Sequence, residues 1–245
     1  MGKRVIAINS SKRKKNTYGI LKELKEKFKE QDIHIDILNL FEYNITPCVG
    51  CESCVRFDKC GLKDDTEKLM EILKSYDGVI LSSPVYMGNV SGMMKLFIDR
   101  TAKWFHRPEL VGKPIMYVVT TAASGINDTT KYLKGVSIQW GMMPTSSITR
   151  TVNTIKKDIR KEEYSDFINH LKMHRDNFKP SLNQLIMYQV QKVLAIKIHE
   201  IDRVFWTERG WNNSIYYYGK IPAYKKSVAK IFYNMLYKKV KKVEN

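Results

Sequence analysis

Apolar residues in the first 150 positions form short runs that alternate with stretches of helical spacing. Each run holds β-branched residues and is bounded by polar or turn-forming positions, as is typical of buried strands. The runs lie at 4–9, 34–38, 78–83, 114–120 and 146–151. Between them, apolar side chains spaced by three and four predict amphipathic helices. One helix starts at Thr17, and another starts near Thr66, which acts as its cap. Two further helices span about 91–103 and 128–140.

Strands that alternate with helices predict a parallel sheet that is covered on both faces. Five such strands suit a doubly wound α/β sheet of strand order 2-1-3-4-5. In that architecture a ligand binds outside the carboxyl ends of the strands, beside strands one and three. The loops that follow strands one, three and four are therefore the first places to look for a site.

Beyond about residue 156 the pattern is helical, without strand-like runs, internal repeats or low-complexity tracts. It predicts helices over 157–178, 181–206 and 222–242, with an aromatic loop over 210–219. We expect one α/β unit over residues 1–178 and a helical C-terminal extension over 179–245.

Composition is that of a globular protein, with 43% hydrophobic and 27% charged residues in a chain of 245. No apolar run reaches the roughly 18 residues of a membrane-spanning helix. The apolar stretch near the N-terminus is shorter than the roughly 7–15 residues of a signal peptide. We therefore expect a cytoplasmic protein.

The loop after the first strand, SSKRKKNT (10–17), is polar and basic. Ser10, Asn16 and Thr17 offer hydroxyl and amide groups at a helix N-terminus, where free N–H groups and the helix dipole favour a phosphate, and Lys12 adds a cation. A helix start rich in Ser, Thr and Asn is also an ordinary cap. Both interpretations stay open on these residues alone.

The loop after the third strand lies in SSPVYMGNVSGMMKLFIDR (82–100). Pro84 fixes the backbone where the strand ends, and Tyr86 and Met87 supply flat and polarizable surface. Gly88 lets main-chain groups approach a ligand closely. The alternative is an ordinary turn between a strand and a helix, with an aromatic residue that packs in the core.

Together with NSSKRKKNT (9–17) and TTAASG (120–125), this motif resembles the NAD(P)H-dependent flavin mononucleotide (FMN) reductase family. The resemblance covers roughly residues 3–150. It implies a flavodoxin-like fold, bound FMN, NAD(P)H as co-substrate and oxidoreductase activity. Two positions depart from the family pattern, which often has Gly at Asn9 and Arg at Lys12, and this puts the strength of phosphate binding in doubt.

The resemblance also implies which residues contact FMN. In the phosphate loop they are Ser10, Lys12, Asn16 and Thr17. Along the isoalloxazine they are Pro84, Val85, Tyr86, Met87, Gly88 and Asn89, and near its pyrimidine edge Thr121, Ala122, Ser124 and Gly125. Lys95, Asp99 and Arg100 match a helix interpreted as structural and near a subunit interface. We predict no catalytic residue, because the flavin itself accepts the hydride.

All four cysteines lie within one segment, as C-x2-C-x2-C-x5-C. The two-residue spacers equal those of bacterial ferredoxin ligand runs. Reduced cytosolic thiols in so tight a group indicate metal or redox chemistry rather than disulfides. Within the reductase family the arrangement is similar to that of iron-sulfur flavoproteins. That resemblance implies a [4Fe-4S] cluster with Cys48, Cys51, Cys54 and Cys60 as its ligands.

Other interpretations of the cysteines stay open: structural zinc, a reductase that keeps these thiols without a cluster, and a disulfide switch. Three functions stay open. With a cluster, the protein would transfer electrons from NAD(P)H or a ferredoxin-like donor to an unknown small-molecule or protein acceptor. Without one, it would be an FMN or quinone reductase, and the third alternative is a non-catalytic redox sensor whose flavin or cluster state changes partner binding.

The formal net charge of +17 has local peaks at 12–15 and 238–242. The second lies on a helix whose apolar stripe comprises Val228, Ile231, Phe232, Met235, Leu236, Val240 and Val243. We expect this stripe to pack against the domain or another subunit rather than a membrane surface. No nucleic-acid-binding motif accompanies the charge, so nucleic acid is not an expected partner. Relatives of this fold commonly form dimers or tetramers, and we expect a homodimer or homotetramer.

Overall fold

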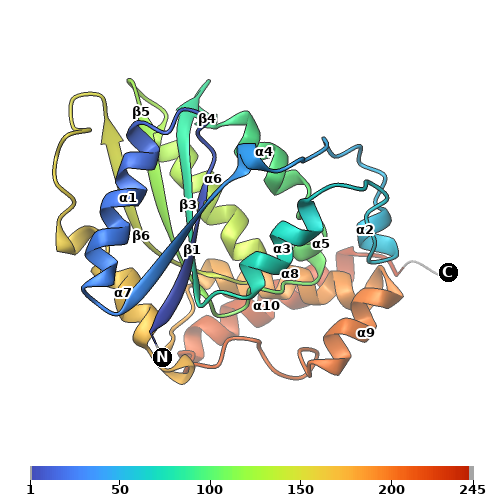
Figure 1. Ribbon diagram of the computed structural model, residues 1–245. Coiled ribbons are helices and arrows are strands. Elements are labelled where there is room, and N and C mark those ends of the chain that lie inside the picture. Colours follow the sequence, from blue (N-terminus) through green and yellow to red (C-terminus); the bar gives the residue numbers. More distant parts are fainter. Residues whose placement is uncertain (1, 243–245) are drawn as a thin grey trace.

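The computed structural model describes residues 2–242 and is built around one parallel sheet (Figure 1). The strands follow the order β2-β1-β3-β5-β6. Their bounds are β1 Lys3–Asn9, β2 Ile33–Asn39, β3 Gly78–Tyr86, β5 Pro114–Thr121 and β6 Met143–Thr151. The expected order 2-1-3-4-5 is confirmed, since the fourth and fifth expected strands are β5 and β6.

Helices cover both faces of this sheet, and each face has its own apolar core. Side chains alternate along a strand, so neighbouring residues of β1 enter different cores. Val5 and Ala7 pack on one face with α1 Asn16–Lys29 and α7 Ser165–Lys172. Ile6 and Ile8 pack on the other face. The helices there are α3 Thr66–Lys74, α4 Gly92–Asp99 and α6 Ile126–Gln139.

The segment after β3 differs from the simple loop expected over 84–89. β3 continues to Tyr86 and pairs antiparallel with a short strand, β4 Asn89–Val90. Met87 and Gly88 between them both have positive φ, 48° and 79°. Two such residues form the type I′ turn that matches the twist of a hairpin. The loop is therefore a rigid hairpin at the carboxyl end of the sheet.

Two expected helix features were wrong in detail. The helix over 91–103 divides into α4 and α5 Lys103–His106, because the N–H groups of Arg100 and Thr101 bond three residues back and end the first helix. Thr66 is the first residue of α3 rather than its cap. The Asp64 carboxylate accepts a hydrogen bond from the Thr66 N–H at 3.0 Å and so satisfies that free N–H group.

The C-terminal extension contains α8 Leu182–Lys197, α9 Glu200–Glu208 and α10 Ala223–Lys239. The expected helix over 181–206 breaks before α9, where His199 is extended. The expected helix over 157–178 was also wrong, because only α7 and two short 3-10 turns, Lys161–Glu163 and Arg175–Asn177, form there. Figure 1 shows the extension, in orange and red, lying beside α6 and α5, with α9 near the single helical turn α2 Ser53–Arg56.

A third apolar core joins the extension to the sheet unit. Aromatic side chains dominate it, including Tyr188, Trp206 and Tyr216, and it takes in Met143 of β6. The Tyr216 hydroxyl donates to Gln191 Oε1 at 2.9 Å, so the loop over 210–219 packs within its own chain. The division into units at residue 178 stays a prediction.

Helix α10 is attached on one side only. Ala229 is buried, and Phe232 and Leu236 are partly buried, whereas Val228, Ile231 and Met235 are exposed. The last residue of the expected stripe, Val243, lies outside the described residues. Within residues 2–242, every helix is too short or too polar to cross a membrane.

Candidate functional site

A cleft of about 330 Å³ opens at the carboxyl ends of the strands, within the size range of small-molecule sites. It lies at the loops after β1, β3, β5 and β6. Its lining comprises Ser11, Arg13, Lys15, Asn16, Thr17, Pro84, Val85, Tyr86, Thr120, Thr121, Ala122, Val152 and Ile155. This is the position where a doubly wound sheet binds its ligand.

About half of the expected FMN contacts line this cleft: Asn16, Thr17, Pro84, Val85, Tyr86, Thr121 and Ala122. The other expected contacts surround it without lining it: Ser10, Lys12, Met87, Gly88, Asn89, Ser124 and Gly125. Their roles as cofactor contacts stay predictions. Six lining residues were not expected as contacts: Ser11, Arg13, Lys15, Thr120, Val152 and Ile155.

The N-terminus of α1 forms one end of the cleft. Lys15 stands at the cap position and makes no side-chain cap bond, and the first turn holds no acidic residue. Free N–H groups with the adjacent cations Arg13 and Lys15 favour a phosphate. The run of four basic residues at 12–15 predicted this charge, but adjacent basic residues in a loop carry no periodicity to show which of them face the cleft.

Ser10 lies beneath the cleft and joins the first two loops. Its hydroxyl donates to the carbonyl of Ser82 at 2.9 Å and accepts from the Ser91 hydroxyl at 2.8 Å. The Ser91 N–H in turn donates to Ser83 Oγ at 2.9 Å. These buried bonds hold the start of α4 against the ends of β1 and β3, and they fix the spacing of the two cleft walls.

Gly125 fixes the third loop against the hairpin. Its φ is +86°, and a Cβ atom there would lie 2.8 Å from Val85 Cγ1 and 3.1 Å from the Gly88 Cα. No other residue type fits without moving one of the two loops.

Gly125→Ala is accordingly expected to weaken FMN binding by about tenfold or more, since a left-handed residue with a side chain costs about 1–2 kcal/mol even before the clash. A fluorescence titration of flavin-free protein measures this change. Gly135→Ala is the matched control, because a Cβ there meets nothing within 4 Å and the residue lies inside α6. Equal dissociation constants for both variants would contradict this role for Gly125.

The cysteine segment, residues 47–65, follows β2 and the 3-10 turn Leu40–Glu42. All four thiols are free, with Cys48 and Cys51 exposed and Cys54 and Cys60 partly buried. Burial raises the pKa of the Cys54 thiol, and the charges of Cys60, Cys48 and Cys51 raise it further. The other three sulfur atoms are therefore within electrostatic reach of Cys54.

Tight turns give the segment this shape. Glu52 and Asp58 both have a φ of 59°, in the left-handed region that residues with side chains rarely adopt, and Gly50 has a φ of 69°, which glycine adopts freely. Such outliers cluster at sites where the backbone is constrained by function. Here they turn the chain back on itself between the cysteines, as the short spacers predict.

A buried arginine from the end of α4 supports the segment. Arg100 donates to Cys60 Sγ at 3.3 Å and to the Thr46 carbonyl at 2.7 Å, and it forms an ion pair with Asp64. Burial raises the pKa of Asp64, but bonds from Arg100 and from the N–H groups of Thr46 and Thr66 outweigh it and hold that pKa well below its usual range. Arg100, expected to be structural and near a subunit interface, contacts the Cys60 thiol.

Arg107, after α5, was not foreseen at all. Its side chain is buried and donates to the carbonyls of Cys54 at 2.6 Å and Val55 at 3.0 Å. Among residues 2–242, no three His, Cys, Asp or Glu side chains converge on a point where one metal ion would sit. The thiols are gathered but are not arranged as ligands of a single ion.

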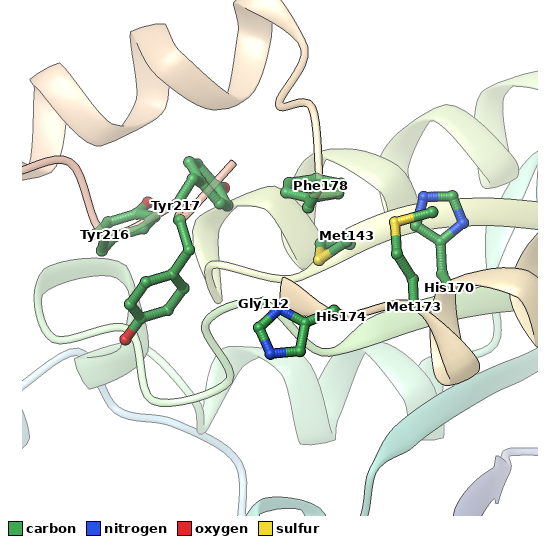
Figure 2. A pocket seen from close by; sticks show the side chains of 9 residues that line it. Gly112, Met143, His170, Met173, His174, Phe178, Tyr216 and Tyr217 are labelled. Carbon is green, nitrogen blue, oxygen red and sulfur yellow. The ribbon is translucent and has the colours of Figure 1, made fainter. Parts of the chain in front are cut away.

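A separate cavity lies between α7 and the aromatic loop, lined by Met143, His170, His174 and Tyr217 among others (Figure 2). Its volume is about 20 Å³, which admits a water molecule and excludes a flavin. This cavity is therefore not a candidate flavin site.

Comparison with known proteins agrees with this geometry. An iron-sulfur flavoprotein of Archaeoglobus fulgidus is 37% identical over 98 residues, which is 40% of this chain and 48% of that protein. One from Methanocaldococcus jannaschii is 35% identical over 99 residues, 40% of this chain and 51% of the relative. The chain thus spans about half the length of these curated relatives.

Solved structures share the fold at low identity. RosB, solved with 8-demethyl-8-formylriboflavin-5′-phosphate, has a TM-score of 0.52 at 9% identity and covers 87% of this chain and 88% of its own. A flavone reductase has a TM-score of 0.51 at 13% identity, and the match covers 69% of this chain and 59% of the reductase. Residues 3–156 match the model of one family. On this match, the chain belongs to the NADPH-dependent FMN reductase family.

Proposed function

We propose that this protein is an FMN-dependent oxidoreductase that takes a hydride from NAD(P)H and passes electrons singly through a [4Fe-4S] cluster to an acceptor. The observation that carries the proposal is the gathering of four free thiols in one constrained segment beside a buried arginine. It is supported by the similarity to proteins named iron-sulfur flavoproteins.

The basic and apolar lining of the cleft and its volume of about 330 Å³ support FMN as its occupant. Arg13, Lys15 and the N-terminus of α1 would hold the phosphate, and Pro84 to Tyr86 would lie along the ring system. Bound flavin supplies the two-electron chemistry, and the chain supplies orientation and electrostatics. The rigid hairpin and the Ser10–Ser91 bonds hold that orientation. No side-chain acid or base is required.

Cys48, Cys51, Cys54 and Cys60 would hold the cluster. A cluster binds one thiolate at each of four irons, so its ligands stand further apart than those of a single ion. Four free thiols within one constrained segment would supply the one thiolate per iron that such a cluster needs. Four thiolates also need compensating charge. Arg100 supplies it at Cys60, and hydrogen bonds from Ser53 together with the charge of Arg100 lower the pKa of Cys51.

An anaerobic titration with NADPH tests the proposal. The visible absorption of the flavin should bleach, followed by the broader absorption of the cluster, and iron should be present in the same sample. Protein that contained FMN without iron or sulfide would disprove electron transfer through a cluster. Hydride transfer from NADPH would then leave a cluster-free FMN or quinone reductase. A cytoplasmic location and a homodimer or homotetramer belong to the same proposal.

A further inference from the structure

Arg107 lies between the cysteine segment and the C-terminal extension and bonds to both. Only 2% of its side chain is exposed. On one side it donates to the carbonyls of Cys54 and Val55. On the other it forms an ion pair with Asp202 of α9, 95 residues away in the sequence. Arg107 therefore links the main chain at Cys54 to Asp202 of the C-terminal extension.

Asp202 is buried like Arg107 and has a second bonding partner, His106. Its side chain is 0% exposed, and its second oxygen bonds to Nδ1 of His106 at 3.0 Å. Trp206, one turn further along α9, donates from Nε1 to the His106 carbonyl at 2.9 Å. Three contacts thus fix α9 against His106, the last residue of α5, and Arg107, which follows it. Removing Arg107 would leave the buried Asp202 carboxylate with His106 beside it, whereas removing Asp202 would leave Arg107 only the half-exposed Asp58, at 3.2 Å, as an ion-pair partner.

The carbonyls that Arg107 satisfies belong to α2, a helix of only four residues. A helix this short is unstable by itself, because nucleation is unfavourable and its last carbonyls have no partner within the helix. Cys54 lies in the middle of α2. The main-chain position of Cys54 therefore depends on the guanidinium of Arg107, which lies outside the cysteine segment.

We propose that Arg107 and Asp202 are positioning residues for the cysteine segment, so that the C-terminal extension completes the site that would hold the cluster. Asp202 orients the guanidinium of Arg107, and Arg107 fixes the turn that carries Cys54. The consequence for the cluster rests on the proposed function, whereas the restraint on the main chain does not.

Asp202→Asn tests this inference, with Glu200→Gln as the matched control on the same helix. The Glu200 side chain is 71% exposed and stands 4.0 Å from Arg203, so its charge restrains nothing buried. Hydrogen exchange of residues 48–60 is measured on iron-free protein. We expect exchange at least tenfold faster in D202N than in wild type or E200Q, with the exchange of β1, β3 and β5 unchanged.

Arg107→Lys is a second variant for the case in which D202N fails to fold. Lysine keeps the ion pair with Asp202, but a single ammonium cannot bond both carbonyls and the carboxylate in the fork geometry of arginine. We expect R107K to fold, to exchange residues 48–60 faster, to release iron to a chelator at least tenfold faster at unchanged FMN content, and to alter the electron paramagnetic resonance signal of the reduced protein.

Folded D202N and R107K with wild-type exchange over 48–60 would overturn the inference. A wild-type protein that holds FMN but no iron would overturn the cluster proposal alone, because the exchange comparison on iron-free protein still decides the role of Arg107 and Asp202.

Discussion

Replacing Cys54 with serine is expected to remove most of the iron that the proposed cluster would bring and to leave FMN in place. Cys54 is partly buried, and burial raises its pKa, as do the charges of Cys60, Cys48 and Cys51. A serine hydroxyl is a poor replacement for a thiolate ligand. No residue of the cysteine segment lines the flavin cleft within the described chain, so flavin binding should be unaffected. Iron, sulfide and FMN per chain are measured after anaerobic purification.

Lys59→Ala is the control for this substitution, because it alters an exposed residue of the same segment that precedes Cys60. The control should keep wild-type iron. If C54S also kept wild-type iron, Cys54 would not be a ligand.

The second large effect concerns stability. Arg100→Met should lower the free energy of unfolding of iron-free protein by about 3–5 kcal/mol, because the Asp64 carboxylate would stay buried without its partner. Lys95→Met on the same helix removes an exposed pair, with Lys95 52% exposed, and should cost no more than about 0.5 kcal/mol. Urea unfolding at pH 7 measures both. Equal losses of unfolding free energy in R100M and K95M would contradict the role of Arg100 as the partner of a buried carboxylate.

The difference between wild type and R100M should also depend on pH. The pKa of Asp64 is lowered in the folded protein, so its stabilising contribution is fully present above the unfolded pKa of about 3.9. It is lost as the pH falls through the lower folded pKa. The stability gap between the two proteins is therefore expected to narrow below about pH 4. A gap that stayed constant from pH 7 to pH 3 would exclude this ion pair as its source.

The sheet was predictable because its signal is local. Each buried strand forms an apolar run, and alternation with helices sets the strand order through general rules of chain connection. The four cysteines were predictable for the same reason, since their spacing is visible in 13 consecutive positions, 48–60. The hairpin was missed because Met-Gly at 87–88 is not one of the usual turn pairs.

The contacts made by arginines could not be predicted. Arg107 is one of 42 basic residues, and its partner Asp202 lies in a helix whose start at residue 200 follows a break without Pro or Gly. An ion pair across 95 residues depends on how the extension packs, and no periodicity encodes it. The same is true of Arg100, whose helical position gave no indication that its side chain turns toward Cys60.

The central claim is that one chain holds both FMN and a four-thiolate iron-sulfur cluster. Iron, acid-labile sulfide and FMN, counted per chain in anaerobically purified wild-type protein, test it most directly. The account predicts about four irons, about four sulfides and about one FMN. FMN alone, with neither iron nor sulfide, would contradict it.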